Sequence, residues 1–490
     1  MTARCVMVLG TTSSAGKSWL ATALCRWYAR QGLKVAPFKA QNMSNNARVV
    51  AGGRFDKLRT GEIGSAQYFQ ALAARCEPEV RMNPLLLKPE RDTHSQVVLL
   101  GKVDEALSRQ GWRGRSASVW PVVAQALDEL RADHDVVVIE GAGSPAEINL
   151  KDSDIVNMRV AAHAQARCLL VTDIDRGGAF AHLYGTWSLL PPQERALIRG
   201  FVLNKFRGDA ALLAPGPEQL QQLTGVPTVA TLPMWWQHGL PEEDGVFDDR
   251  SRGAGPVNRT IAVVAYPRIS NLDEFQPLAN VPGVRLVWAR SPAQLAGADW
   301  IVLPGSKHTA GDLAWLRGQG LDRAVAQHAA QGGAVLGICG GLQMLGEALI
   351  DTHGIDGNAP GLGLLPLVTS FEPDKTVLKT QAAFGAVQGP WAALRGVAVS
   401  GYEIHHGRTA PHPAMAPGRE VMPGLAWQNP AGNVLGVYLH GLFEDPAVLK
   451  ALFGAAVPTL DSVFDGLADF IDCHFEKDVI PDLIRDPRTA

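Results

Sequence analysis

Short apolar runs alternate along the chain with longer segments in which apolar and polar positions recur at helical spacing. Continuous runs of Val, Ile and Leu are typical of strands buried on both faces, as in a parallel sheet covered by helices. Strands are predicted at 6–9, 135–139, 168–172, 200–204, 260–264, 299–303 and 332–338 and in the run that begins at Val434. The alternation of these strands with helices predicts an α/β fold built on parallel sheets.

A polar, glycine-rich stretch at 241–258 interrupts this pattern. Interdomain linkers commonly have such a composition, and a chain of 490 residues is long enough for several domains. We therefore predict an α/β domain at 1–240, a linker at 241–258, a second α/β domain at 259–450 and a C-terminal extension at 451–490. The end of this extension, after Phe475, is charged and interrupted by prolines, and we predict that it is a tail.

A glycine-containing turn, Gly10-Thr-Thr-Ser-Ser-Ala-Gly-Lys-Ser18, lies between the predicted strand at 6–9 and an amphipathic helix predicted at 19–27. In this setting backbone N–H groups and the helix N-terminus cradle phosphate, a lysine reaches the terminal phosphates and a hydroxyl binds magnesium. The usual loop begins with glycine where Thr11 stands here, and an ordinary turn is the alternative. We predict that ATP contacts Thr11, Thr12, Ser13, Gly16, Lys17 and Ser18, and that Ser18 also binds Mg²⁺.

Polar side chains follow several predicted strands, at the edge where ligands collect in open parallel sheets. Acidic groups there suit magnesium, an arginine suits phosphate or carboxylate, and a row of amides suggests recognition of a polar substrate. Ordinary turns and solvated charges are the alternatives. The predicted roles are metal binding by Glu140 and Asp173, substrate binding by Gln41, Asn42 and Arg176, and nucleotide binding by Asn204.

A second turn with chemical character, Gly337-Ile-Cys-Gly-Gly341, joins the predicted strand at 332–338 to a helix predicted at 342–349. A sharp strand-to-helix corner exposes a nucleophile, requires small neighbours and places the sulfur at a helix N-terminus, which favours the reactive thiolate. A base must lie near in space, and His440 at the end of another apolar strand is the best candidate. A buried structural cysteine is the alternative interpretation of Cys339.

Composition and charge exclude several classes of protein. The formal net charge of −3 argues against a broad nucleic-acid-binding face. The chain has no apolar run long enough to cross a membrane, and its N-terminus lacks the form of a signal peptide. The six cysteines show no metal-type spacing, which fits a reducing compartment. We expect a cytoplasmic protein that does not bind membranes.

Taken together, the motifs of the chain resemble those of the adenosylcobyric acid synthase family, the glutamine-hydrolysing enzymes of cobalamin biosynthesis. The resemblance covers nearly the whole chain, and the number and order of the motifs make it specific. The motifs are Pro37-Phe-Lys-Ala-Gln-Asn-Met43, Met82-Asn-Pro-Leu-Leu-Leu-Lys-Pro89, Glu140-Gly-Ala-Gly-Ser-Pro-Ala-Glu-Ile-Asn149, Asp173-Ile-Asp-Arg-Gly-Gly178, Asn204-Lys-Phe-Arg-Gly-Asp209, Leu303-Pro-Gly-Ser-Lys307, Gly337-Ile-Cys-Gly-Gly341, Gly401-Tyr-Glu-Ile-His405 and Tyr438-Leu-His-Gly-Leu-Phe443. The resemblance implies an N-terminal P-loop domain similar to dethiobiotin synthetase and a C-terminal domain of the class I glutamine amidotransferase type.

The family amidates the b, d, e and g carboxylates of adenosylcobyrinic acid a,c-diamide, using ATP and ammonia released from glutamine. The resemblance therefore implies ATP and Mg²⁺ as cofactors and glutamine and a corrinoid as substrates. It also implies that Cys339 is the nucleophile and His440 the catalytic histidine. We expect the oxyanion donors to be the backbone N–H groups at Gly340 and Gly305. The oligomeric state is left open, and a homo-oligomer is compatible with the sequence.

The sequence leaves the third member of the Cys–His site open. Many amidotransferases with this nucleophile turn carry Glu two residues after the catalytic histidine, where this chain has Leu442. The cobyrinate-type branch resembles this chain in lacking that acid, so Cys and His can act as a dyad. Glu403 and Glu444 are the candidates for an acid that orients His440.

Three alternative functions are consistent with part of the sequence. A P-loop partitioning or regulatory ATPase would share the first motif, but would leave Cys339 and His440 without a role. A corrinoid-binding module with inactive sites is the second, and glutamine hydrolysis would exclude it. The third is the a,c-diamide synthase that acts earlier on cobyrinic acid.

Overall fold

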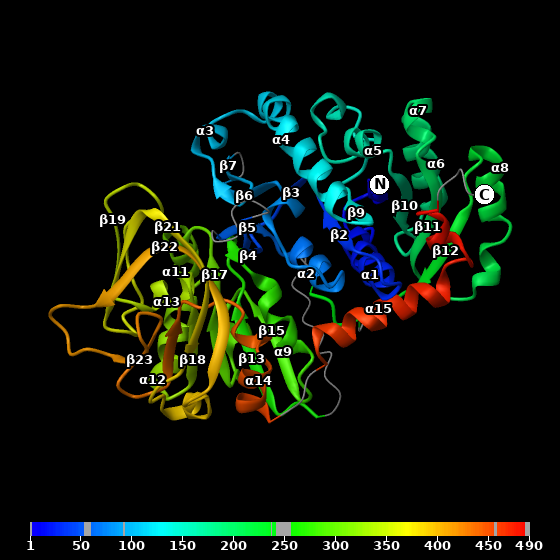
Figure 1. The fold of residues 1–490 in the computed structure, drawn as a ribbon. Coiled ribbons are helices and arrows are strands. Elements are labelled where there is room, and N and C mark those ends of the chain that lie inside the picture. The colour runs from blue at the N-terminus through cyan, green and yellow to red at the C-terminus, as the bar shows by residue number, and fades with distance from the viewer. Residues whose placement is uncertain are drawn as a thin grey trace.

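The computed structural model of the protein describes residues 2–52, 60–91, 94–236, 238–241, 256–454 and 458–485. Two α/β units lie side by side in it (Figure 1). Most of the predicted linker at 241–258 lies outside the described residues.

The N-terminal unit is built on a six-stranded parallel sheet with the order β12-β11-β10-β1-β9-β2. Its strands are β1 (Arg4–Gly10), β2 (Val35–Phe38), β9 (Val136–Glu140), β10 (Arg167–Asp173), β11 (Ile198–Phe206) and β12 (Thr228–Pro233). β1 lies in the middle of the sheet, and its carboxyl end leads into the predicted phosphate loop. The loop therefore lies between the ends of β9 and β10, which carry the predicted metal ligands Glu140 and Asp173.

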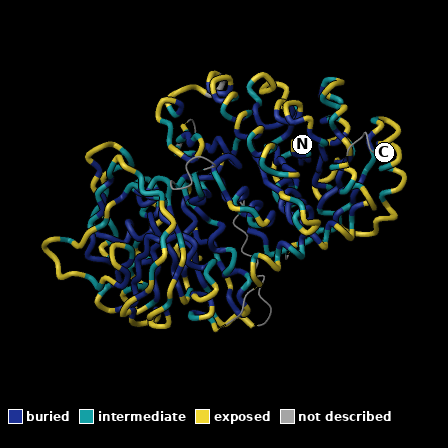
Figure 2. The backbone as a smooth tube through the Cα atoms, viewed as in Figure 1, coloured by how far each residue is buried: buried dark blue, intermediate teal, exposed yellow. Residues whose placement is uncertain are grey.

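Helices cover both faces of this sheet, and the strands between them are buried (Figure 2). On one face α1 (Lys17–Arg30) and α2 (Ser65–Ala73) bury apolar side chains such as Leu24 and Phe69. On the other face α4 (Trp112–Asp133), α5 (Met158–Ala164) and α6 (Ala179–Leu189) do the same with Leu127, Val160 and Leu183. Burial on both faces is the physical reason why the strands read as continuous apolar runs.

The C-terminal unit is built on a seven-stranded sheet with the order β15-β13-β16-β18-β25-β24-β23. The first five strands are parallel, and β24 and β23 continue the sheet in antiparallel fashion. The strands are β13 (Arg259–Val264), β15 (Val284–Ala289), β16 (Trp300–Leu303), β18 (Ala334–Ile338), β23 (Arg419–Met422), β24 (Ala426–Gln428) and β25 (Val434–Val437). The helices of this unit include α11 (Thr309–Gly318), α12 (Leu321–Ala330), α13 (Gly340–Leu345) and α14 (Pro446–Phe453).

Smaller strands bring the two units together. From the N-terminal unit, β4 (Ala47–Ala51) and β5 (Thr60–Gly64) pair as an antiparallel ribbon, and β3 (Gln41–Met43), β6 (Leu85–Arg91), β7 (His94–Leu99) and β8 (Lys102–Val103) form a small sheet. From the C-terminal unit, β21 (Leu367–Ala383) and β22 (Ala398–Pro411) form a long hairpin. The hydroxyl of Thr60 donates to the carbonyl of Val377 at 2.5 Å, which joins the β4–β5 ribbon to this hairpin.

The C-terminal segment returns to the N-terminal unit, where α15 (Leu460–His474) packs along α1 (Figure 1). Phe464 and Leu467 are buried in the apolar layer formed with α1. Beyond Phe475 the chain stays attached, because Ile480 and Leu483 are buried and the carbonyl of Ile480 accepts a hydrogen bond from the Tyr28 hydroxyl. The prediction of a tail after Phe475 is therefore wrong as far as residue 485. The charged residues around Ile480 and Leu483 made the segment look exposed in the sequence, although these two side chains are buried.

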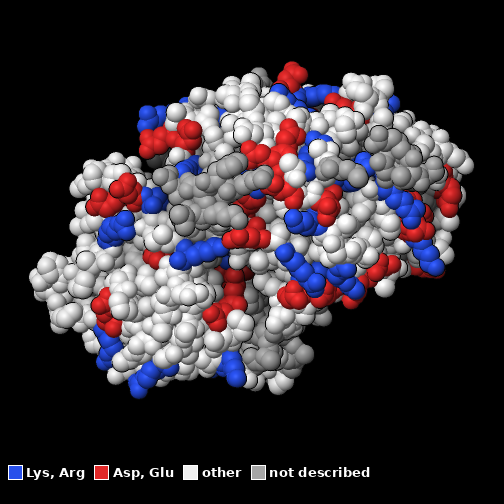
Figure 3. Space-filling view, in the orientation of Figure 1, with Lys and Arg blue, Asp and Glu red and all other residues white. Residues whose placement is uncertain are grey.

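Charged side chains of both signs are interspersed on the face of the molecule drawn in Figure 3. Among the described residues, no helix is both long enough and apolar enough to cross a membrane.

Candidate functional site

Cys339 lies in a tight turn between β18 and α13. It adopts φ 50° and ψ −104°, a backbone conformation that is strained for a residue with a side chain and is found preferentially at functional sites. The turn has no room for larger neighbours, because a Cβ atom at Gly341 would lie 1.9 Å from the carbonyl oxygen of Leu303. The glycines of this motif are therefore required by the close passage of β16 behind the nucleophile.

The helix after the nucleophile is shorter than the sequence predicts. Instead of the helix expected at 342–349, α13 ends at Leu345, and residues Ala348–Asp351 form strand β19. A Cβ atom at Gly346 would lie 2.8 Å from the carbonyl oxygen of Leu367, so the chain turns where it crosses β21. The apolar residues 348–349 fit the periodicity of a helix and of a strand equally well, so the pattern alone predicted a helix that is too long.

His440 follows β25, and it lines the same cavity as Cys339. Its Nδ1 atom lies 3.1 Å from Oε1 of Glu274, and the other carboxylate oxygen of Glu274 accepts a hydrogen bond from the backbone N–H of Gly441 at 2.9 Å. Glu274 is fully buried in the 3₁₀ turn Leu272–Phe275. A carboxylate in this position orients the imidazole and stabilises its charged form.

The charges around His440 favour the imidazolium. Burial by itself would lower the pKa of His440, but the negative charges of Glu274 and Cys339 and their hydrogen bonds outweigh burial and raise this pKa to about 10. The ring of Tyr402 stacks on the imidazole, with 5.4 Å between ring centroids. The geometry thus pairs a nucleophilic sulfur with a histidine that is held ready to donate a proton.

Neither of the acids that the sequence offered as orienters serves His440. Glu403 accepts hydrogen bonds from Thr380 at 2.7 Å and from His405 at 3.0 Å. Glu444 forms an ion pair with Arg48 at 2.6 Å. Glu274 was missed because it precedes His440 by 166 residues in the chain, and no local motif links the two.

The predicted oxyanion donors lie beside the nucleophile. A Cβ atom at Gly305 would lie 2.7 Å from Cε1 of His440, and one at Gly340 would lie 2.7 Å from the backbone nitrogen of Ser306. The backbones of the two glycines therefore converge on the Cys339–His440 pair. Their role as oxyanion donors stays a prediction.

The predicted phosphate loop has the expected strand–loop–helix setting between β1 and α1. Gly16 adopts φ 102°, which favours glycine. The ammonium group of Lys17 donates to the carbonyls of Thr12 at 2.9 Å and Gly143 at 3.2 Å, so it spans the loop. Asn204, a predicted nucleotide contact, donates to the carbonyl of Ala15 at 2.9 Å and supports the loop backbone.

The remaining predicted ATP contacts line the same loop. The hydroxyl of Thr11 donates to that of Thr172 at 2.9 Å and is buried, whereas Thr12 is partly exposed and Ser13 is exposed. Thr11 therefore anchors the loop to β10, and the accessible part of the loop begins after it.

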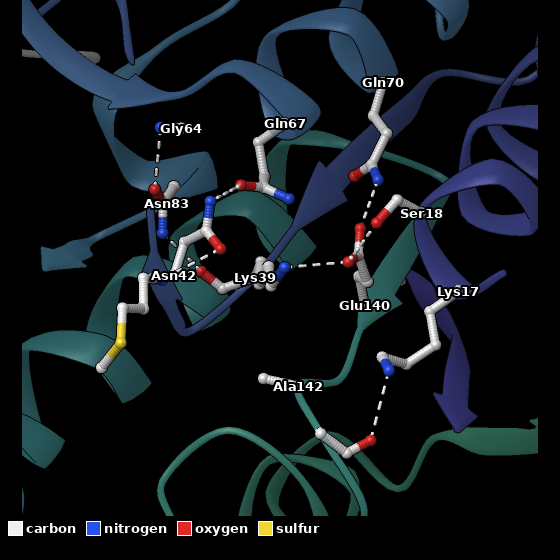
Figure 4. Close-up of polar contacts among 12 residues, drawn as sticks. Lys17, Ser18, Lys39, Asn42, Gly64, Gln67, Gln70, Asn83, Glu140 and Ala142 are labelled. Atoms are coloured by element: carbon white, nitrogen blue, oxygen red, sulfur yellow. Dashed lines mark hydrogen bonds and ion pairs between the residues drawn. The ribbon is translucent and has the colours of Figure 1, made fainter. Parts of the chain in front are cut away.

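A buried carboxylate network lies beside the phosphate loop, at the end of β9 (Figure 4). One oxygen of Glu140 accepts from the Ser18 hydroxyl at 2.7 Å and from the Lys39 ammonium at 2.9 Å, and the other accepts from Gln70 at 2.6 Å. Burial by itself would raise the pKa of Glu140, but Lys39 and the hydrogen bonds from Ser18 and Gln70 outweigh it and hold this pKa below its usual range. Glu140 is therefore a carboxylate next to the predicted phosphate site.

The residues at this point fit a magnesium ion. The Ser18 hydroxyl and the Glu140 carboxylate are hard oxygen groups within 2.7 Å of each other at the start of α1. Asp173 is not brought to them, because it ends β10 on the other side of β1, where it pairs with Lys205 at 3.0 Å and Arg176 at 3.3 Å. Within the described residues, no group of three or more His, Cys, Asp or Glu side chains is arranged to hold a metal.

The predicted substrate residues separate into two places. Gln41 and Asn42 belong to β3, and Asn42 donates to Gln67 at 3.4 Å beside Lys39 (Figure 4). Arg176 lies in the loop after β10 next to Asp173, with most of its side chain exposed. The sequence predicted no role for Lys39 or Gln70, although both donate hydrogen bonds to Glu140. Lys39 directly follows β2, at a strand end where it could have been found.

A cavity of about 1180 Å³ lies between the two units and reaches Cys339. Both units line it with polar and charged side chains, among them Asn45, Glu62, Lys88, Asn271, Cys339, Lys375 and His440. Several buried polar atoms of the N-terminal unit lack a hydrogen-bond partner among the described residues, and of their residues Asn45 lines the cavity: Asn45 Oδ1, Ser65 Oγ, Gln67 Nε2 and Gln70 Oε1. Such atoms are rare in folded proteins and point to a polar ligand or water.

The chain is similar to known proteins over its full length. Residues 6–242 match the CobQ/CobB/MinD/ParA nucleotide-binding domain, and residues 260–448 match the CobB/CobQ-like glutamine amidotransferase domain. The chain is 78% identical to a cobyric acid synthase of Variovorax paradoxus (strain S110), over 99% of this chain and 100% of that protein. It is 76% identical to a cobyric acid synthase of Polaromonas naphthalenivorans (strain CJ2), over 99% of this chain and 100% of that protein.

Among solved structures, a glutamine amidotransferase covers 40% of this chain and 99% of its own, with 16% identity and a TM-score of 0.31. This likeness is too low to add to the argument. The two domain matches and the relatives, however, confirm the predicted family, the predicted class of enzyme and the α/β fold with a P-loop domain followed by an amidotransferase domain. The chain belongs to the cobyric acid synthase family of glutamine amidotransferases.

Proposed function

We propose that the protein uses ATP and glutamine to amidate the b, d, e and g carboxylates of adenosylcobyrinic acid a,c-diamide, giving adenosylcobyric acid. The observation that carries the proposal is that Cys339 and His440 open into a cavity whose other wall belongs to the nucleotide-binding unit. A glutaminase site would have no use for this shared cavity if ammonia were released to solvent. The names of the full-length relatives supply the substrate class.

In the glutaminase half, the sulfur of Cys339 attacks the side-chain carbonyl of glutamine. His440 gives its proton to the departing ammonia, and Glu274 stabilises the imidazolium that precedes this transfer. The N–H groups at Gly340 and Gly305 donate hydrogen bonds to the carbonyl oxygen as negative charge develops on it. Water then hydrolyses the thioester to release glutamate and the free thiol.

In the synthetase half, a corrinoid carboxylate attacks the γ-phosphate of ATP. The phosphoryl group is transferred to the carboxylate, which becomes an acyl phosphate, and ADP is released. Lys17 and Lys39 neutralise charge on the transferring phosphate, and Ser18 and Glu140 would hold Mg²⁺. When bound, the ion supplies further charge neutralisation at the phosphates. Ammonia displaces phosphate from the acyl phosphate to form the amide, and Gln41, Asn42 and Arg176 are the proposed contacts to the corrinoid.

The base of ATP has a candidate place near the end of β11. A cavity of about 530 Å³ lies there, lined by Phe206, Thr231, Met234 and Trp236 among others. Phe206 follows Asn204 by two residues, and Asn204 supports the phosphate loop. Apolar walls with a few polar groups suit a stacked purine.

We further propose that ammonia travels inside the protein from Cys339 to the phosphate site. Free ammonia is mostly protonated at neutral pH and would be lost to solvent. The unpartnered polar atoms of Asn45, Gln67 and Gln70 support a route from the cavity to Glu140, because Gln70 binds that carboxylate directly. We also propose a cytoplasmic location, because all six cysteines are free, as is usual in a reducing compartment.

Replacing the nucleophile tests whether the two chemistries are separate. We expect Cys339→Ala to abolish glutamine-supported amidation and to keep most of the amidation supported by high ammonium. Corrinoid products are measured by mass spectrometry, and circular dichroism confirms that the variant is folded. If a folded variant loses both activities, the assignment of separate sites is wrong.

A further inference from the structure

Arg48 belongs to the nucleotide-binding unit, on β4, yet its guanidinium pairs with acidic side chains of the glutaminase unit. It is 1% exposed and is among the largest fully buried side chains of the described protein. Its guanidinium forms an ion pair with Asp273, which is equally buried, and a second one with Glu444 at 2.6 Å. A guanidinium can hold two carboxylates at once because its donors form a planar fork.

The partners of Arg48 are the immediate neighbours of the groups that contact His440. Asp273 precedes Glu274 in the same 3₁₀ turn, and Glu274 binds Nδ1 of His440. The guanidinium also lies over the ring of Tyr402, 5.1 Å from its centroid, and this ring stacks on the His440 imidazole. Arg48 thus contacts one support of the catalytic histidine, Tyr402, and the residue next to the other support, Glu274.

The backbone around Arg48 is fastened to the same turn. The N–H of Ala47 donates to the Asn271 side chain at 3.0 Å, and the side chain of Asn46 accepts from the N–H of Leu272 at 3.0 Å. Asn271 in turn donates to the Tyr402 hydroxyl at 3.1 Å and adopts a left-handed conformation at the start of the turn. The position of the turn that carries Glu274 therefore depends on residues 46–48 of the other unit.

We propose that Arg48 is a positioning residue of the glutaminase site, acting across the interface through Asp273 and Tyr402 on the Glu274–His440 pair. Buried ion pairs contribute little net stability, and their best-attested use is to fix one arrangement among several. Residues 46–48 also continue the segment that begins with Lys39, Gln41 and Asn42 at the phosphate site. The segment thus runs from the phosphate site to the glutaminase site. The alignment of His440 with Cys339 therefore depends on how the nucleotide-binding unit docks against the glutaminase unit. This inference rests on the proposed function only in assigning His440 to glutamine hydrolysis.

The test uses the full chain with Arg48→Lys, which keeps the charge but loses the fork, and Asp273→Asn, which removes the same ion pair from the other side. Thr60→Val is the matched control, since it removes the interface hydrogen bond to Val377 from the neighbouring strand. The first readout is the rate at which iodoacetamide alkylates Cys339 as a function of pH, followed on the Cys339 peptide by mass spectrometry. The second is the rate of corrinoid amidation with glutamine and with ammonium.

We expect both Arg48→Lys and Asp273→Asn to lower the glutamine-supported rate by roughly 10- to 100-fold, the effect of misplacing a catalytic group by about 1 Å. The ammonium-supported rate should stay unchanged, and the alkylation of Cys339 should slow because the imidazolium is no longer aligned with the sulfur. Thr60→Val should leave all three unchanged.

The proposal is overturned if the folded variants keep wild-type glutamine use and wild-type Cys339 reactivity, or if they lose glutamine-supported and ammonium-supported amidation equally. If the wild type amidates no corrinoid with either nitrogen source, the proposed function fails instead. The alkylation profile then still decides whether Arg48 positions His440.

Discussion

Glu274 illustrates, at the scale of single residues, what a sequence can and cannot tell. Cys339, His440 and Lys17 could be chosen from the sequence because each stands in a local motif whose geometry the chemistry requires. Glu274 has no such motif, and its role depends on a contact between a turn before β15 and the end of β25. Glu403 and Glu444 were closer to His440 in the chain but are committed to His405 and Arg48.

Replacing Glu274 with glutamine should separate its charge from its shape. We expect Glu274→Gln to reduce glutaminase kcat by roughly 10²–10⁴-fold, as when the orienting acid of other catalytic histidines is lost. Removal of the negative charge should also lower the pKa of His440 from about 10. Because the imidazolium is the proton donor, the alkaline limb of the pH profile should move to lower pH.

Glutamate release measured from pH 6 upward checks this prediction. Glu403→Gln is the matched control, since Glu403 is a neighbouring buried acid that does not contact His440. An alkaline limb that stays in place in Glu274→Gln would show that another group holds the charge of His440.

At the scale of elements, the sequence predicts best where an element is buried on both faces. The central strands of both sheets were found because their apolar runs are continuous. The β4–β5 ribbon and the β21–β22 hairpin were not found, because these strands mix polar and apolar residues and pair only through tertiary contacts. Those are also the elements that form the interface and the cavity.

α15 stabilises the N-terminal unit, although it comes from the opposite end of the chain. Leu467 is fully buried against the layer formed with α1. We expect Leu467→Ala to lower the free energy of unfolding of this unit by about 2–5 kcal/mol, through lost burial and the cavity left behind. Urea denaturation followed by circular dichroism measures the change.

Asp469→Asn on the same helix is the control, because the Asp469 side chain is 63% exposed in its ion pair with Arg30. Its effect should stay below about 1 kcal/mol. Equal free energies of unfolding for Leu467→Ala and the wild type would mean that the packing of α15 does not stabilise the unit.

At the scale of the whole molecule, the sequence predicts two chemistries but not how they face each other. The two domain matches give the same division into a nucleotide-binding part and an amidotransferase part. The cavity between the units depends on how the units dock. Docking is set by many contacts between residues distant in the chain, such as Arg48 with Asp273 and Lys375 with Glu62, and no pattern within one segment encodes it.

The central claim is that ammonia made at Cys339 reaches a corrinoid acyl phosphate without leaving the protein. The most direct measurement supplies adenosylcobyrinic acid a,c-diamide, ATP, Mg²⁺ and glutamine with an isotopically labelled amide nitrogen, in the presence of unlabelled ammonium. Mass spectrometry of the corrinoid should show one labelled amide for each of the b, d, e and g carboxylates. Unlabelled amides would contradict the internal route, and amidation of cobyrinic acid in place of its a,c-diamide would contradict the proposed reaction.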